Sequence, residues 1–178
     1  MSYPILLLPH PDTCAGQVES IAVQVVLLPT GALQLIYTLT GNLTTIRLPG
    51  IAPASRSNGL WQHTCFEAFI RPADSPAYRE FNFSPSGQWQ AYTFHTYRDG
   101  GLLEPATNPD IECLREPGRL RLQATLQPEN LPLGACLRLG LSAVVQGAAG
   151  SISYWALQHA AGKPDFHHPD SFVLDITP

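Results

Sequence analysis

A strict alternation of apolar and polar residues is the feature that most constrains how this chain folds. Between Arg119 and Gln127 the sequence reads Arg-Leu-Arg-Leu-Gln-Ala-Thr-Leu-Gln, so every second residue is apolar. Successive side chains of a β-strand point to opposite faces, whereas the pattern of a helix repeats every ~3.6 residues. The segment therefore predicts a strand with one face in a core and the other in water.

The same alternation runs from Leu33 to Leu39 and from Leu137 to Val145. Other segments are predicted strands between turn signals, and they span residues 21–28, 65–70, 78–84, 88–95, 152–157 and 172–176. Gly- and Pro-containing turns separate these segments, and no window shows a helical stripe. We therefore predict an all-β protein, a single antiparallel β-sandwich of jelly-roll or immunoglobulin-like type with about ten strands.

One domain is expected over residues 1–178, because the chain has no linker or internal repeat and has a length typical of one domain. Three irregular loops are expected, over residues 49–61, 100–112 and 158–171. Such long connections often carry the binding residues of a β-sandwich.

The charge pattern excludes several kinds of partner. The net charge is −4 and the ten basic residues are scattered, so we expect no nucleic-acid partner. The apolar run before Pro9 has four residues, too short for a signal peptide, and no run is long enough to cross a membrane. We expect a cytoplasmic protein without a membrane partner. The four cysteines form no CxxC pair, so we expect free thiols.

Polar residues interrupt two predicted strands that are otherwise apolar. Glu67 shares a face with Cys65 and Phe69, and Asn82 shares a face with Glu80. A carboxylate at such a position is costly unless it is paired or wet. One interpretation is a polar floor of Glu67, Glu80 and Asn82 in a ligand cavity. The other is a buried ion pair between Glu67 and an arginine, Arg79 or Arg98.

Two tryptophans lie beside predicted loops. Trp61 precedes the strand that starts near Cys65, and Trp155 lies close to the loop that starts at Gln158. Either they stack on a ligand or they fill the core. Trp89 follows a Ser-Pro-Ser-Gly turn within a strand, and we expect it in the core.

The C-terminal loop and one turn supply further polar candidates. Lys163 and His167 would form a rim beside Trp155, and Arg98 follows a strand in the turn Tyr97-Arg98-Asp99-Gly100. His159, His167 and His168 lack the spacing of a zinc site. We therefore expect these histidines to bond loop carbonyls, and we predict no metal site.

Three motifs resemble a known family. They are Trp-x-His-Thr-Cys-Phe-Glu-x-Phe from Trp61, Glu-Phe-Asn-x-Ser-Pro-Ser-Gly-x-Trp from Glu80, and Tyr-Trp-Ala-Leu…Lys-Pro-Asp-Phe-His from Tyr154. Together they resemble the bacterial DOMON-like domains, relatives of the family 9 carbohydrate-binding modules. The resemblance extends over almost the whole chain.

The resemblance implies a single β-sandwich with a ligand site between loops at one end or face. Family members bind sugars, or haem in some branches, and some sit beside oxidoreductase domains. Sugar-binding relatives hold the ligand between two aromatic residues, which match Trp61 and Trp155. Their matching strand carries a ligand-contacting glutamate, at the place of Glu67.

We therefore predict non-catalytic binding of a small polar ligand, a saccharide or sugar derivative, without a cofactor. The predicted ligand-binding residues are Trp61, Glu67, Asn82, Arg98, Trp155, Lys163 and His167. A haem-binding redox or sensor domain is the alternative. Met1 is the one methionine, so such a haem would need two histidine ligands. A protein-interaction module and an oxidoreductase partner encoded separately also stay open.

Overall fold

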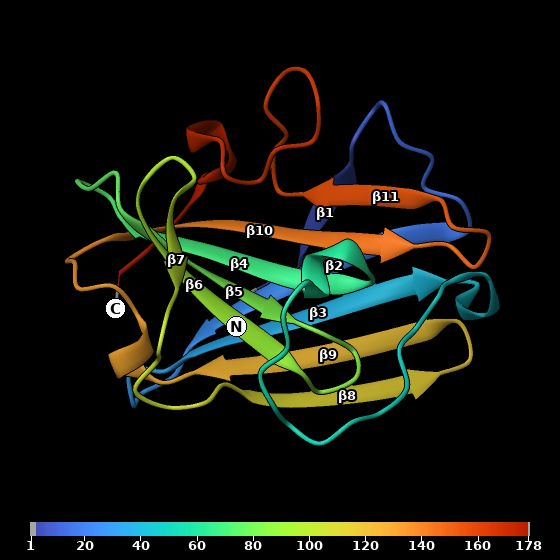
Figure 1. Ribbon diagram of the computed structural model, residues 1–178, viewed down its shortest axis with the longest axis horizontal. Helices are drawn as coiled ribbons and strands as arrows, with labels where there is room; N and C mark the ends of the chain where they lie inside the picture. Colours follow the sequence, from blue (N-terminus) through green and yellow to red (C-terminus); the bar gives the residue numbers. More distant parts are fainter. Residues whose placement is uncertain (1–2, 178) are drawn as a thin grey trace.

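The computed structural model describes residues 3–177, and its regular secondary structure consists almost entirely of strands (Figure 1). The strands are β1 (Ile5–Pro9), β2 (Val18–Leu27), β3 (Leu33–Gly41), β4 (Cys65–Pro72), β5 (Tyr78–Phe83), β6 (Trp89–Thr96), β7 (Asp99–Leu102), β8 (Asp110–Glu116), β9 (Arg119–Leu126), β10 (Leu137–Gln146), β11 (Ile152–Ala156) and β12 (Leu174–Ile176). Four 3-10 turns of three residues each are present: η1 (Leu43–Thr45), η2 (Leu60–Gln62), η3 (Pro128–Asn130) and η4 (Pro169–Ser171). The predicted all-β antiparallel fold is confirmed, with twelve strands.

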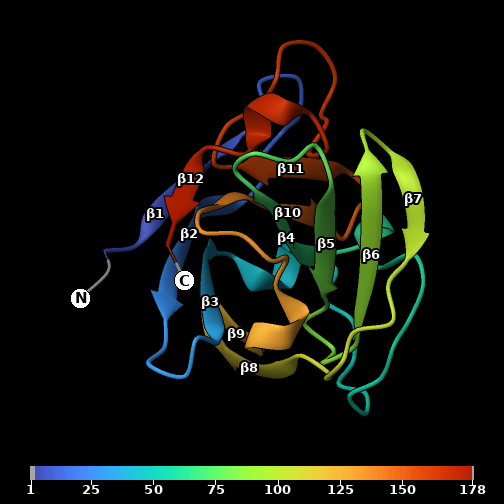
Figure 2. The ribbon, with the colours of Figure 1, turned by 90° about the vertical axis from the view of Figure 1, so that its left-hand side faces the viewer.

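The strands form the two layers of a β-sandwich. One layer has the order β1-β2-β3-β9-β8, and the other has the order β7-β6-β5-β4-β10-β11. β1 joins the layers, because Ile5 to Leu7 pair with β2 whereas Leu8 and Pro9 pair with β11. β12 pairs with the start of β10. The chain thus closes the sandwich along one side and leaves β7 and β8 at the free edges (Figure 2).

The alternating side chains meet in the core between the layers. Leu35 and Tyr37 of β3 and Leu122 of β9 are fully buried there, as are Phe66 and Ala68 of β4. The Tyr37 hydroxyl donates a 2.8 Å hydrogen bond to the backbone carbonyl of Glu67 on the opposite layer. This bond links β3 of one layer to β4 of the other at Glu67, the residue that carries the predicted carboxylate.

The second layer is also covered on its outer face. Phe69, Tyr78 and Phe94 of that face form an apolar cluster with Phe166 and Phe172, which come from the segment 157–173. In Figure 2 this segment passes above β10 and β11. The six residues from Cys65 to Ile70 are consequently all buried. A strand buried on both faces tolerates a polar residue only where other groups or a cavity receive it.

The prediction of an irregular loop over residues 100–112 is wrong, because this range contains most of β7 and the start of β8. β7 reads Asp-Gly-Gly-Leu, a composition typical of turns, and none of its residues is buried. Gly100 is nevertheless required in this strand. A Cβ at this position would lie 2.0 Å from the carbonyl oxygen of Thr93 on β6.

We predict that Gly100→Ala destabilises the protein by about 1–3 kcal/mol, the usual cost of forcing an extra methyl group into a filled space. Urea unfolding measures the change. Gly101→Ala is the matched control, since a Cβ at Gly101 meets nothing within 4 Å, and we expect a change below about 0.5 kcal/mol. Equal changes in the free energy of unfolding for the two variants would show that the close approach of β6 and β7 at Gly100 does not contribute to stability.

Candidate functional site

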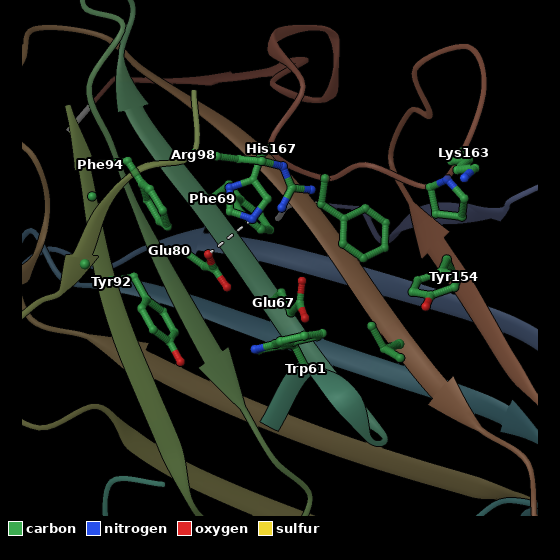
Figure 3. Close-up of a pocket in the computed structure, with 15 residues that line it drawn as sticks. Trp61, Glu67, Phe69, Glu80, Tyr92, Phe94, Arg98, Tyr154, Lys163 and His167 are labelled. Atoms are coloured by element: carbon green, nitrogen blue, oxygen red, sulfur yellow. Dashed lines mark ion pairs between the residues drawn. The ribbon is translucent and has the colours of Figure 1, made fainter. Parts of the chain in front are cut away.

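A pocket of about 670 Å³ lies on the outer face of the second layer (Figure 3). Residues of β4, β5, β6, β7, β10 and β11 line it from below and from the sides. η2 contributes Trp61 and the β6–β7 turn contributes Arg98. The segment 157–173, which covers this face, contributes Lys163, Pro164, Phe166 and His167. This volume falls in the range of small-molecule sites, ~300–1,000 Å³.

Two buried glutamates form the polar part of the floor. Glu67 pairs across the ladder with Asn82, and Glu80 pairs with Phe69, so the two carboxyls occupy diagonal positions on one face of β4 and β5. Glu67 is 2% exposed and Glu80 is 5% exposed. Both side chains line the pocket, as the alternation predicted for a polar floor.

The hydrogen bonds at the floor are incomplete. Asn82 Nδ2 donates a 2.8 Å bond to Oε1 of Glu80, and the Ser142 hydroxyl donates a 3.4 Å bond to Oε2 of Glu67. Among the residues that the structure describes, Oε1 of Glu67 is buried and has no hydrogen-bond partner. A buried acceptor of this kind normally finds a donor in protein, water or ligand.

Burial shifts the acid–base behaviour of both floor carboxyls. Removal from water raises the pKa of Glu67 well above its ordinary value, and the charge of Glu80 raises it further. Burial also raises the pKa of Glu80, to about 7, against the lowering effects of the Asn82 hydrogen bond and the Arg98 charge. Each carboxyl is thus poised to change charge when a cation or proton enters the pocket.

His167 is inserted into the aromatic floor beside Glu80. Its ring meets Phe69 and Phe94 edge-on, with 5.1 Å between the ring centroids in both pairs. Burial, followed by the charge of Arg98, lowers the pKa of His167 to about 4, so the ring is neutral near pH 7.

The hydrogen bonds around Tyr78 indicate which nitrogen of His167 carries the proton. The backbone N–H of Arg98 donates to the Tyr78 hydroxyl at 3.1 Å, and that hydroxyl lies 2.8 Å from Nδ1 of His167. A phenol that accepts from Arg98 has its own hydrogen free to donate to Nδ1. The ring hydrogen is then on Nε2, the atom 3.7 Å from the Glu80 carboxylate.

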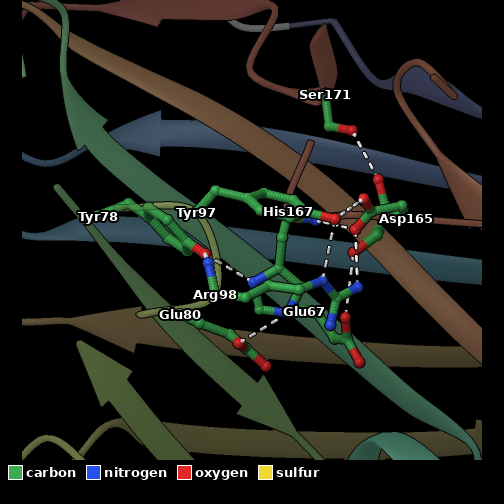
Figure 4. A network of polar contacts seen from close by, with 9 residues as sticks. Glu67, Tyr78, Glu80, Tyr97, Arg98, Asp165, His167 and Ser171 are labelled. Carbon is green, nitrogen blue, oxygen red and sulfur yellow. Dashed lines mark hydrogen bonds and ion pairs between the residues drawn. The ribbon is translucent and has the colours of Figure 1, made fainter. Parts of the chain in front are cut away.

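A polar clasp holds the covering segment against the β6–β7 turn (Figure 4). Arg98 Nη2 donates a 2.8 Å hydrogen bond to Oδ1 of Asp165, and the Tyr97 hydroxyl donates a 2.7 Å bond to Oδ2. These hydrogen bonds, together with the charge of Arg98, keep the pKa of Asp165 below its ordinary value, although burial opposes them. Arg98 adopts the left-handed conformation, with φ of 57°, in the two-residue turn between Thr96 and Asp99.

Aromatic side chains form the walls. Trp61 is 50% exposed on η2 and faces the pocket beside Glu67. Tyr92 of β6 and Tyr154 of β11 line it on the two sides. An exposed indole beside buried carboxyls is the combination by which proteins bind sugar rings, because the ring faces are apolar and their edges are polar.

The structure brings five of the seven predicted ligand residues to this pocket: Trp61, Glu67, Arg98, Lys163 and His167. The prediction is wrong for Trp155, which is 3% exposed, belongs to the core cluster and donates its indole N–H to the Ser153 hydroxyl. Asn82 is fully buried on the same face as Glu67 and Glu80, where it donates to Glu80, and it does not line the pocket. The expectation that Trp155 and Asn82 line the shared cavity is therefore corrected.

Tyr154 takes the place in the pocket that was assigned to Trp155. In a strand, neighbouring residues point to opposite faces, so only one of these two aromatics can reach the cavity. The motif Ser-Tyr-Trp-Ala contains that alternation but does not identify the inner face. The ion-pair interpretation of Glu67 is also wrong, because Arg98 pairs with Asp165 and Arg79 donates to the Asn130 carbonyl. Trp89 is buried in the core as predicted.

Two other histidines, His159 and His168, contact backbone groups. His159 Nε2 lies 2.8 Å from the Leu8 carbonyl oxygen, and His168 Nδ1 accepts from the Asp170 N–H at the start of η4. Within residues 3–177, no group of three or more His, Cys, Asp or Glu side chains is arranged to hold a metal ion. In the same range, no helix is long and apolar enough to span a membrane.

Solved structures with the same fold include sugar-binding proteins. A candidate carbohydrate-binding protein from Bacteroides uniformis has a TM-score of 0.72 and 13% identity, with 99% of this chain and 85% of that chain covered. A family 9 carbohydrate-binding module from Caldicellulosiruptor kristjanssonii in complex with cellotriose has a TM-score of 0.62 and 10% identity, with 99% and 82% covered. A family 9 module from the same organism in complex with glucose has a TM-score of 0.59 and 10% identity, with 99% of this chain and 83% of that chain covered.

No protein-family model and no curated protein sequence matches this chain. At 10–13% identity the structural neighbours show the fold, and they confirm a β-sandwich like that of the family 9 modules.

The positions of two tryptophans give a test of the site. We expect Trp155→Ala to lower the free energy of unfolding by about 3–5 kcal/mol, as for a truncated core tryptophan. Trp61→Ala should change it by less than about 0.5 kcal/mol, because the side chain is half exposed. Urea unfolding measures both variants. A large loss for Trp61→Ala with a small one for Trp155→Ala would reverse our assignment of core and site.

A second test uses the pH dependence of stability. Because the pKa of Glu80 is about 7 in the folded protein and ordinarily 4.5, folding binds a proton between these values, and this contribution to stability is lost as pH rises. His167 acts in the opposite sense between pH 4 and 6.5, since its pKa is lowered. The comparison of wild type with Glu80→Gln cancels the histidine contribution.

We expect the stability of wild type relative to Glu80→Gln to fall by about 2–3 kcal/mol between pH 5 and pH 8. Urea unfolding at both pH values measures the difference. Glu112→Gln, on an exposed position of β8, is the control and should track wild type at both pH values. A constant difference between wild type and Glu80→Gln would mean that Glu80 titrates normally.

Proposed function

We propose that this protein binds a saccharide, without catalysis, in the pocket above β4 and β5. The observation that carries the proposal is the pairing of a half-exposed Trp61 with two buried carboxyls in one cavity of about 670 Å³. The glucose and cellotriose complexes of modules with the same fold support it. Trp61 would stack on a sugar face, and Glu67 would accept hydrogen bonds from its hydroxyls.

Tyr154 and Tyr92 replace the second stacking tryptophan of the predicted site. Their rings stand on opposite sides of the floor, at the two ends of the row that Glu67 and Glu80 occupy (Figure 3). The clasp of Arg98 and Asp165 would keep the covering segment in position over the bound sugar, and Lys163 would lie at its rim. We therefore assign Arg98 and His167 to shaping the pocket, since their polar groups already have protein partners.

Haem binding, the alternative function of the DOMON-like resemblance, does not fit these residues. His167 is the one histidine among the described residues that lines the pocket, and its Nδ1 lies 2.8 Å from the Tyr78 hydroxyl. Its Nε2 faces Glu80 within the aromatic cluster. Two axial histidines are not brought together here. Membership of the DOMON-like group stays a prediction. A cytoplasmic location is also a prediction, which cell fractionation tests, and so is a separate oxidoreductase partner, which co-purification tests.

Isothermal titration calorimetry with cellotriose and a panel of neutral oligosaccharides tests the proposal. We expect binding to wild type and about tenfold or greater weakening in Trp61→Ala, because a stacked ring is lost. Tyr3→Ala is the control, since Tyr3 is an exposed aromatic residue that does not line the pocket.

The proposal fails if wild type binds no saccharide, or if Trp61→Ala binds as well as wild type. Release of reducing sugar during the titration would contradict the non-catalytic assignment, because the raised pKa of Glu80 is also what a general acid of a glycosidase needs.

A further inference from the structure

The floor of the pocket holds two buried carboxyls, Glu67 and Glu80, that have no lysine or arginine partner among the described residues. Oε1 of Glu67 is buried without a hydrogen-bond partner in the described residues, and Oε2 has only the long bond from Ser142. β10 and β11 contribute Val144 and Tyr154 to the same lining, and neither is a basic residue. A buried carboxyl left in this state calls for a donor from the ligand.

The cations around the floor are engaged or distant. Arg98 is paired with Asp165 at 2.8 Å, so its charge is already matched. His167 faces Glu80, but burial lowers its pKa to about 4, and it adds no charge near pH 7. Lys163 lies on the side of the pocket where Tyr154 stands, away from both carboxyls (Figure 3). An ionised Glu67 therefore has no cation paired with it among the described residues.

The walls suit a cation as well. Trp61, Tyr92, Phe94 and Tyr154 surround the space above the carboxyls. The faces of aromatic rings attract ammonium groups, most strongly where water is excluded. An ammonium also carries three hydrogen-bond donors and no acceptor, which matches a floor whose free polar atoms are acceptors.

We infer that the preferred ligand is an amino sugar, a saccharide with a protonated amine that Glu67 and Glu80 hold on the floor while Trp61 stacks on the ring. This inference rests on the proposed function and specifies the ligand class for the same pocket. Neutral sugars can occupy the same space, but they bring no charge to the unpaired carboxyl.

Three trisaccharides with the same β-1,4 linkage separate the contributions. Cellotriose carries a hydroxyl at position 2 of each ring, the glucosamine trisaccharide an ammonium, and the N-acetylglucosamine trisaccharide an uncharged amide. In calorimetry at pH 6, where the amino groups are protonated, we expect the glucosamine trisaccharide to bind roughly ten- to hundredfold more tightly than the other two, as for a charge-assisted hydrogen bond. Glu67→Gln should reduce this preference to near unity, and Glu112→Gln should leave it unchanged.

A measurement on wild type covers the case in which Glu67→Gln does not fold. Because burial raises the pKa of both floor carboxyls, an entering ammonium should displace protons from them. Titrations at pH 6 in two buffers of different ionisation enthalpy should show proton release, of up to about one per site, for the glucosamine trisaccharide and none for cellotriose.

The outcomes are distinct. Equal affinities for the three trisaccharides, or tighter binding of cellotriose, would overturn the amino-sugar inference while saccharide binding stands. A preference that survives Glu67→Gln would remove Glu67 from the proposal and overturn it as stated. Failure of all three to bind would overturn the proposed function itself. Charge preference with proton release, lost in Glu67→Gln, supports the inference.

Discussion

The site depends on the packing of the segment 157–173 against the outer face of the second layer. Phe166 and Phe172 bury Phe69, Tyr78 and Phe94 there, and the hydrogen bond between Arg98 and Asp165 fixes the segment at its middle. Without this cover, Glu67 and Glu80 would stand on an open sheet face with ordinary solvation. With it, they form the buried floor of a pocket, and their charged forms become costly.

That cost is consistent with a binding role. A core of this size would gain stability from an apolar residue in place of Glu67, since an unpaired buried carboxyl contributes nothing to packing. The chain instead holds Glu67 in place from below through the Tyr37 hydroxyl, and it holds Glu80 through Asn82. Positioning of polar groups before a ligand arrives reduces the ordering cost of binding. The free energy that the unliganded protein loses by burying the Glu67 carboxyl would then be regained when a ligand binds to it.

Period-two alternation was sufficient to predict the sandwich and to place Glu67 and Glu80 on one face. It was not sufficient where a strand is buried on both sides. β11 has aromatic residues at neighbouring positions, and nothing in Ser-Tyr-Trp-Ala says that Trp155 faces the core and Tyr154 the pocket. The Arg98–Asp165 clasp joins residues 67 positions apart and has no local signal. β7 was missed because its two glycines, one required by close backbone approach, look like a turn.

The indole N–H signals of the three tryptophans give the most direct test that this pocket is the saccharide site. Trp61 lines the pocket, whereas Trp89 and Trp155 are buried in the core. In a two-dimensional ¹H–¹⁵N NMR titration with a bound oligosaccharide, the signal lost in Trp61→Phe should shift strongly and the other two should stay near their free positions. A shift confined to Trp89 or Trp155, or binding that leaves the Trp61 signal unmoved, would contradict the account.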